Sequence, residues 1–181
     1  MDNSRLASRY AKALFQLAKE RNKMEIVKQD LSKLTGLLHE SAEFRWLLES
    51  PVITSSVKVG LVAKALTGAI DTLTLDFMQL LVEHRRESNL ASTCRMFMEL
   101  YKKDQGIMEA KVESAIPVEV AFLDGLKKSL EKSSNKIIEM TTVTNESLIG
   151  GFILTLEDQQ LDASVQSKLK RIRQELRESK K

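Results

Sequence analysis

Residues that interrupt helices are scarce in this chain, which has two prolines and seven glycines among 181 residues. Aromatic residues make up only 5% of the sequence, so a core would consist mainly of aliphatic side chains. Hydrophobic residues account for 43% and charged residues for 29%, a balance that excludes an intrinsically disordered chain. Because few helix breakers favour helices, the composition predicts a mainly helical globular protein of one domain or two small ones.

The single cysteine, Cys94, excludes an internal disulfide and any metal site built from several cysteines. Cys94 lies among apolar residues at helical spacing, which predicts a buried, inert thiol. The longest apolar stretch without charge, residues 147–156, has about half of the ~20 residues that a membrane-spanning helix needs. Residues 1–9 lack the apolar segment of a secretory signal. We therefore expect a cytosolic protein, or one attached to a membrane only through partners.

The sequence contains no recognisable catalytic motif. Gly150 and Gly151 form an isolated pair without the lysine and third glycine of a phosphate-binding loop. Asp158 and Asp162 do not have the spacing of a calcium-binding loop, and they are typical of a polar turn and helix N-cap. We expect no catalytic residue, metal or cofactor, although an enzyme whose active site is assembled only by folding stays an open alternative.

The first hundred residues have a helical period throughout, with breaks at residues suited to caps and turns such as Pro51 and Gly68. We predict six helices there, at residues 4–20, 23–39, 41–48, 55–67, 72–86 and 89–104. Six short helices with tight connections are typical of a compact bundle.

The period changes to two at Gly106, where apolar and charged residues begin to alternate. We predict strands at residues 108–114, 138–142 and 152–156, and helices after Pro117 and at residues 163–178. The predicted fold class is therefore mainly α with a smaller α/β part: a six-helix bundle over residues 1–105, then a small β-α-β-β-α domain over residues 106–181.

Two predicted bundle helices, at residues 4–20 and 72–86, have apolar arcs of roughly 200°, whereas a surface helix needs about 100°. One interpretation is that both helices are central in the bundle. The other is that part of each arc borders a groove that accepts an amphipathic helix from another protein. Ala7, Ala11 and Ala13 would then permit close approach. The pattern is compatible with both interpretations.

The last predicted helix has a narrow apolar seam at a 4-3-4 spacing, formed by Val165, Leu169, Ile172 and Leu176. Residues 163–181 contain seven bases and two acids, a net charge of +5, although the whole chain carries only +3. The seam could pack on the chain's own sheet beneath a solvated basic face. Alternatively, the bases could steer an acidic protein segment or a nucleic acid to this helix. The segment has no aromatic residue for base stacking, which argues against nucleic acid.

Several stretches, in order over nearly the whole chain, resemble the delta subunit of bacterial and chloroplast ATP synthases and its mitochondrial counterpart, the oligomycin-sensitivity-conferring protein. They are ASRYAKALF at residues 7–15, LLESPVI at 47–53, FMQLLVEHRRE at 77–87, VESAIP at 112–117, SLIGGF at 147–152 and DASV at 162–165. Glu157 and Arg85 depart from the pattern, because they stand where this family often has glycine.

The resemblance implies that the bundle holds the N-terminal helix of an ATP synthase alpha subunit between its first and fifth helices. The residues carried over by position to that contact are Tyr10, Ala13, Leu14, Phe77, Leu80, Leu81 and His84. It further implies that the C-terminal domain meets the peripheral-stalk b subunit, to which we assign Val165, Leu169, Ile172, Arg173 and Leu176. Gly150, Gly151 and Asp162 are expected to be structural, the glycines allowing a tight turn or close backbone approach.

The function implied by the resemblance is that of a non-catalytic stator connector. One copy would join the catalytic head to the peripheral stalk, at the cytoplasmic face of the membrane, without inserting into it. The alternative expectation is a helical protein that binds nucleic acid through its basic last helix.

Overall fold

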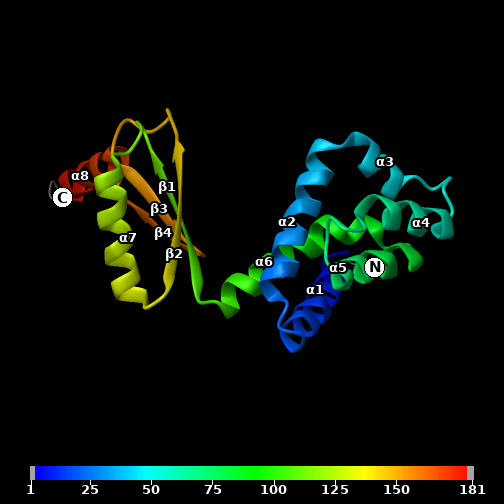
Figure 1. The fold of residues 1–181 in the computed structure, drawn as a ribbon. Helices are drawn as coiled ribbons and strands as arrows, with labels where there is room; N and C mark the ends of the chain where they lie inside the picture. Colours follow the sequence, from blue (N-terminus) through cyan, green and yellow to red (C-terminus); the bar gives the residue numbers. More distant parts are fainter. Residues whose placement is uncertain (1–2, 179–181) are drawn as a thin grey trace. The chain divides into compact units, whose positions relative to one another are not determined.

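The structure is a computed structural model that describes residues 3–178, and it divides the chain into two compact units, residues 1–102 and 103–181 (Figure 1). Among the described residues, the first unit is mainly helical and the second contains a four-stranded mixed sheet with two helices. The predicted fold class is confirmed.

All six predicted bundle helices are present, with ends close to those expected. They are α1 (Asn3–Glu20), α2 (Met24–Glu40), α3 (Ala42–Glu49), α4 (Ser55–Leu66), α5 (Thr72–Glu83) and α6 (Leu90–Asp104), with a short 3-10 turn, η1 (Glu87–Asn89), before α6. Side chains cap two of the starts. The Ser41 hydroxyl accepts the Phe44 N–H at the start of α3, and the Asp71 carboxylate accepts the Leu73 N–H at the start of α5.

The bundle core is aliphatic, as the shortage of aromatic residues requires. Its fully buried side chains include Leu31, Leu34, Val62, Met78, Leu81, Leu90 and Phe97. Ala7 and Ala11 are also fully buried, as expected where this part of the first helix is central in the bundle. Cys94 is buried as predicted, and burial raises the pKa of its thiol to about 11, which keeps it protonated and unreactive.

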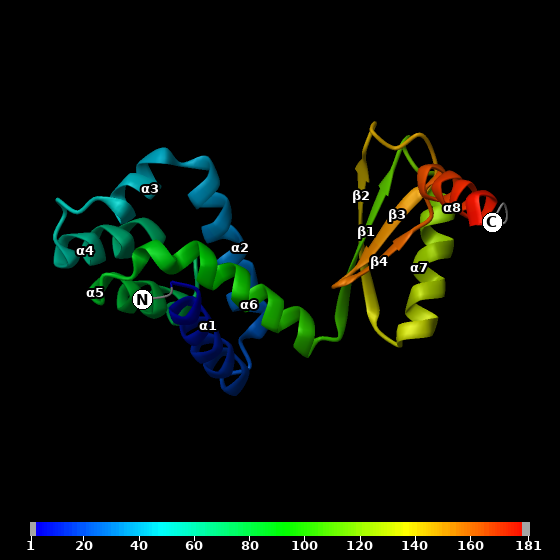
Figure 2. The ribbon, with the colours of Figure 1, turned by 180° about the vertical axis from the view of Figure 1, so that it is seen from behind.

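The second unit contains one strand more than predicted. Its elements are β1 (Ile107–Ser114), α7 (Val120–Ser134), β2 (Ile137–Thr144), β3 (Phe152–Leu156), β4 (Gln159–Asp162) and α8 (Val165–Glu178). The strand order is β2-β1-β3-β4; β1 and β2 are parallel and the other pairs antiparallel (Figure 2). Every residue of β4 is exposed, so this edge strand has no buried face that a sequence pattern could indicate.

One face of the sheet packs against α7. The buried residues Ala110, Val112, Ile138 and Leu154 form the centre of this core. Partly buried leucines of α7 cover them, and the ring of Phe122 meets that of Phe152 edge-on, with 5.4 Å between centroids. The predicted alternation in β1 thus corresponds to a sheet with one packed face.

Four described residues other than glycine adopt the left-handed conformation, and two of them, Arg85 and Glu157, stand where the resemblance predicts glycine. Arg85, just beyond α5, has a φ of 55°, and the next N–H, that of Arg86, donates to the Leu81 carbonyl at 2.8 Å. Glu157, between β3 and β4, has a φ of 48°. Such a conformation costs about 1–2 kcal/mol for a residue with a Cβ. Both turns therefore form without the glycines that the resemblance led us to expect, at a small cost in stability.

The start of α8 is held against the start of β3 by backbone contacts. The Val165 N–H donates to the Gly150 carbonyl at 3.0 Å, and Gly151 has a φ of +79°. A Cβ on Gly151 would lie 2.4 Å from the carbonyl oxygen of Ala163, closer than non-bonded atoms approach. The structure thus places both glycines where the backbone of another segment passes close by.

The N-cap of α8 is Ser164 and not Asp162, which corrects the expectation from the sequence. The Ser164 hydroxyl accepts the Ser167 N–H at 3.2 Å. Asp162 ends β4, and its carboxylate accepts hydrogen bonds from the Ser164 N–H at 2.8 Å and the Ser167 hydroxyl at 2.5 Å. These bonds from Ser164 and Ser167 lower the pKa of Asp162 from its ordinary value. Asp162 therefore supports the cap from one position outside it.

Candidate functional site

An open cavity of about 530 Å³ lies between α1 and α5. We call it the α1–α5 groove. Its lining residues on the α1 side are Leu6, Arg9, Tyr10, Ala13, Leu14, Leu17 and Arg21, and those on the α5 side are Leu73, Asp76, Phe77, Leu80 and His84. The four-residue and three-residue steps from Leu6 through Tyr10 and Ala13 to Leu17 place these side chains on one face of α1.

The interior of the groove is apolar and partly open to solvent. Leu14 and Leu73 are almost completely buried, whereas Leu17 and Leu80 are 36% and 41% exposed. The rings of Tyr10 and Phe77 meet edge-on across the groove, with 6.5 Å between centroids. Exposed apolar side chains beside a concave apolar surface are typical of protein interaction sites.

Polar and charged residues lie at the margins of this apolar surface. Arg9, Arg21, Asp76 and His84 line the groove and are all exposed. An apolar interior with a polar margin has the character of a surface that receives the apolar face of an amphipathic helix. Within residues 3–178, no group of three histidine, cysteine or acidic side chains could hold a metal ion.

The structure brings together six of the seven residues predicted to contact an alpha-subunit helix. The seventh, Leu81, is buried in the bundle core and does not line the groove, so the structure does not bring it together with the other six. Leu81 follows Leu80 directly, and a rotation of 100° on the helix turns it away from the cavity. The wide apolar arc of α5 is thus explained by two contacts: one part of it packs in the bundle core and the other part lines the groove.

Several residues that line the groove were not predicted from the sequence. Leu6, Leu17 and Leu73 belong to the two wide apolar arcs, and their helical spacing from the assigned residues could have identified them. Arg9, which also lines the groove, carried no such signal, because its position at the margin depends on how α1 and α5 pack.

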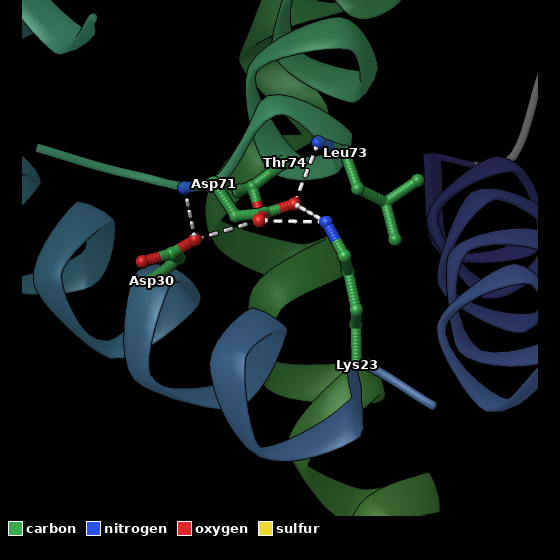
Figure 3. A network of polar contacts seen from close by, with 5 residues as sticks. All are labelled: Lys23, Asp30, Asp71, Leu73 and Thr74. Atoms are coloured by element: carbon green, nitrogen blue, oxygen red, sulfur yellow. Dashed lines mark hydrogen bonds and ion pairs between the residues drawn. The ribbon is translucent and has the colours of Figure 1, made fainter. Parts of the chain in front are cut away.

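A polar network joins the first half of α2 and its N-cap, Lys23, to the start of α5 (Figure 3). The Lys23 ammonium contacts both carboxylate oxygens of Asp71, at 2.9 and 2.8 Å. Behind them, the buried Asp30 carboxylate of α2 accepts the Asp71 N–H at 2.7 Å and the Thr74 hydroxyl at 3.1 Å. The hydrogen bond from Lys23 is the largest cause of a lowered pKa at Asp71, followed by the bond from the Leu73 N–H.

We expect Asp71→Asn to lower the free energy of unfolding at neutral pH and to have progressively less effect as the solution is acidified. Because the folded-state pKa of Asp71 lies below its unfolded value of about 3.9, its stabilisation is present above that value and is lost as pH falls through the folded pKa. Denaturant titrations between about pH 7 and pH 2, followed at amide signals of α2 and α6, measure this. A loss that is independent of pH, or equal to that of the exposed control Asp76→Asn, would contradict the expectation.

The apolar seam of α8 is largely open. Val165, Leu169 and Ile172 are 40–55% exposed, and Arg173 is exposed beside them. Leu176, the fourth predicted seam residue, lies in α8, but its side chain is outside the part of the chain that the structure describes. The chain's own sheet therefore leaves much of this seam uncovered. None of the helices among residues 3–178 is both long and apolar enough to cross a membrane.

Comparison with known proteins gives consistent matches over most of the chain. The profile of the family described as "ATP synthase delta (OSCP) subunit" matches residues 6–176. The "ATP synthase subunit delta" of Azorhizobium caulinodans is 35% identical over 176 residues, which cover 97% of this chain and 95% of the relative. The protein of the same name from Desulfitobacterium hafniense is 34% identical over 171 residues, covering 94% and 96%.

The fold is also similar to that of a solved protein. A chain in the cryo-EM structure of the Toxoplasma gondii mitochondrial ATP synthase hexamer superposes with a TM-score of 0.71 and 28% sequence identity. The match covers 94% of this chain and 97% of that chain, so it includes both compact units.

Proposed function

The chain belongs to the ATP synthase delta (OSCP) subunit family, and we propose that it joins the catalytic head of the enzyme to the peripheral stalk. Members of this family are non-catalytic stator components of F-type ATP synthase, a complex that couples ATP synthesis to proton transport. The connection would restrain the head against the torque of the rotating shaft. We place one copy in each complex, at the cytoplasmic face of the membrane and attached through its partners.

The open apolar α1–α5 groove is the observation that carries the proposal. We assign to it the N-terminal helix of an alpha subunit. Leu6 and Leu17 are eleven residues apart on α1, so the apolar surface is about 16 Å long, or about three helical turns. A short amphipathic helix could place three or four apolar side chains over it, with Leu80 and Tyr10 among the main contacts.

The test is a calorimetric titration of the full chain with a peptide that covers the N-terminal segment of the alpha subunit from the same organism. The proposal expects saturable binding of one peptide, with the negative heat-capacity change that accompanies burial of apolar surface. A scrambled peptide of the same composition is the control. Equal binding of both peptides, or no binding of either, would remove the assignment.

We assign the second contact, with the peripheral-stalk b subunit, to the exposed seam of α8. The seam residues Val165, Leu169 and Ile172 could receive an apolar strip, and the surrounding Lys168, Lys170, Arg171 and Arg173 would favour an acidic segment. Membership in this family favours a protein partner here over nucleic acid. Because two sites on one chain raise each other's effective concentration, modest separate affinities would still give a durable link between head and stalk.

We expect Leu169→Asp to weaken binding of the b subunit by about tenfold, because it places a carboxylate in the centre of the seam. Binding of a soluble b-subunit fragment to the full-length chain, measured by surface plasmon resonance, provides the readout. Ile116→Asp, at an exposed aliphatic residue outside α8, is the control and should change little. Unchanged affinity for the Leu169 variant would exclude α8 from the contact.

A further inference from the structure

The two walls of the α1–α5 groove come from helices that are far apart in the sequence, and one ion pair joins them at one end. Lys23 lies in the turn between α1 and α2, two residues after the groove residue Arg21, and it is the N-cap residue of α2; Asp71 precedes α5, two residues before the groove residue Leu73. The Lys23 ammonium contacts both oxygens of the Asp71 carboxylate within 2.9 Å. The pair therefore joins the turn that ends the α1 wall to the residue that begins the α5 wall.

Both residues of the ion pair lie at helix ends: Lys23 between the end of α1 and the start of α2, and Asp71 at the start of α5. The Lys23 N–H donates to the Ala18 carbonyl at 2.8 Å, which closes the C-terminal cap of α1 through Asn22 in the left-handed conformation. Asp71 is the N-cap of α5, since its carboxylate accepts the Leu73 N–H at 2.9 Å. A displacement of either side chain is thus transmitted directly to the position of a helix.

Asp30 also binds the start of α5 (Figure 3). Its buried carboxylate receives the Asp71 N–H and the Thr74 hydroxyl, and its other oxygen lies 3.3 Å from the Lys33 ammonium. Lys33 also donates to the Ala69 carbonyl at 3.0 Å, in the connection that leads into α5. The start of α5 is consequently bound at two points, by Lys23 in the turn between α1 and α2 and by Asp30 within α2.

We propose that Lys23, Asp71 and Asp30 act as a clamp that sets the width of the α1–α5 groove and so determines how tightly it holds a helix. This inference rests on the proposed function of the groove. None of the three residues lines the cavity, so they act as positioning residues through Leu73 and the walls. A preorganised groove binds more tightly because less ordering is left to occur on binding.

The test compares Lys23→Met with Lys58→Met in the full-length chain. Lys58 forms a second ion pair within the bundle, 2.6 Å from the Glu87 carboxylate and more deeply buried than Lys23, but it does not line the groove. Calorimetric titration with the alpha N-terminal peptide should show an affinity about tenfold lower for Lys23→Met and within twofold of wild type for Lys58→Met. Lys23→Arg retains the charge and should retain the affinity.

A distance measurement separates positioning from general destabilisation. Spin labels at residues 20 and 72, both exposed and next to the clamp, report the separation of α1 and α5, and the buried Cys94 does not compete for labelling. The distance distribution should be narrow in the wild type and in Lys23→Arg, and broader in Lys23→Met.

The possible outcomes separate the clamp from the groove assignment. Wild-type affinity for Lys23→Met, an unchanged distance distribution, or an equal loss for Lys58→Met would overturn the clamp and leave the groove assignment intact. If the wild-type chain itself fails to bind the peptide, the proposed function of the groove fails, and the distance distributions still decide whether the clamp sets the groove width.

Discussion

Leu80→Asp is expected to lower the affinity of the chain for the alpha-subunit N-terminal segment by about 100-fold, which corresponds to about 2.7 kcal/mol. The substitution removes an exposed apolar side chain from the α1–α5 groove, and it places a carboxylate where an apolar partner would have to cover it. Because Leu80 is 41% exposed in the free chain, the fold should change little. Calorimetric titration measures the loss, and circular dichroism checks that the helices remain.

Leu61 provides a closely matched control. It is also a leucine on a bundle helix, α4, and it is exposed to the same extent, 41%, but it lies outside the groove. Leu61→Asp should leave the affinity within about twofold of wild type. If both aspartate variants bind the peptide equally well, the peptide does not occupy the α1–α5 groove.

Gly151→Ala is expected to destabilise the second unit by about 3 kcal/mol or more. The new Cβ would meet the Ala163 carbonyl oxygen at 2.4 Å and the Ser164 Cα at 2.9 Å, and both atoms belong to the backbone. The left-handed conformation adds about 1–2 kcal/mol, and moving the chain apart would weaken the bonds that join residues 150–152 to the start of α8.

Amide hydrogen exchange can measure this effect separately for the two units. Protection should fall in β1 and β3 and remain unchanged in α2 and α6, because the clash lies within residues 103–181. Gly125→Ala is the control: a Cβ there meets nothing within 4 Å in the middle of α7, and the substitution should stabilise by about 0.5–1 kcal/mol. Wild-type protection in Gly151→Ala would contradict the account of the junction.

The parts of the fold that follow a strong period could be predicted from the sequence. The six bundle helices were predicted from apolar residues at helical spacing, and the strands β1, β2 and β3 from side chains that repeat every second residue. The edge strand β4 could not be found this way, since its pairing with β3 comes from backbone hydrogen bonds and its side chains are all exposed. The sequence predicts the N-cap of α8 two residues too early, at Asp162, because Asp162 and Ser164 are both good capping residues.

The candidate site was predictable only in part. A wide apolar arc shows that a helix has more than one apolar contact, but it does not say which contact belongs to the chain itself. Leu80 and Leu81 illustrate this limit, because the first lines the groove and the second is buried in the core. The pairing of Lys23 with Asp71, 48 residues further along the chain, depends on tertiary packing and has no local signal.

The central claim, that the α1–α5 groove holds the alpha-subunit N-terminus, can be tested most directly in the assembled enzyme. A photo-crosslinking amino acid at position 80, in ATP synthase purified from the source organism, should form an adduct with the N-terminal segment of an alpha subunit. The same amino acid at position 61 should not. Adducts from position 80 that never include that segment would contradict the account.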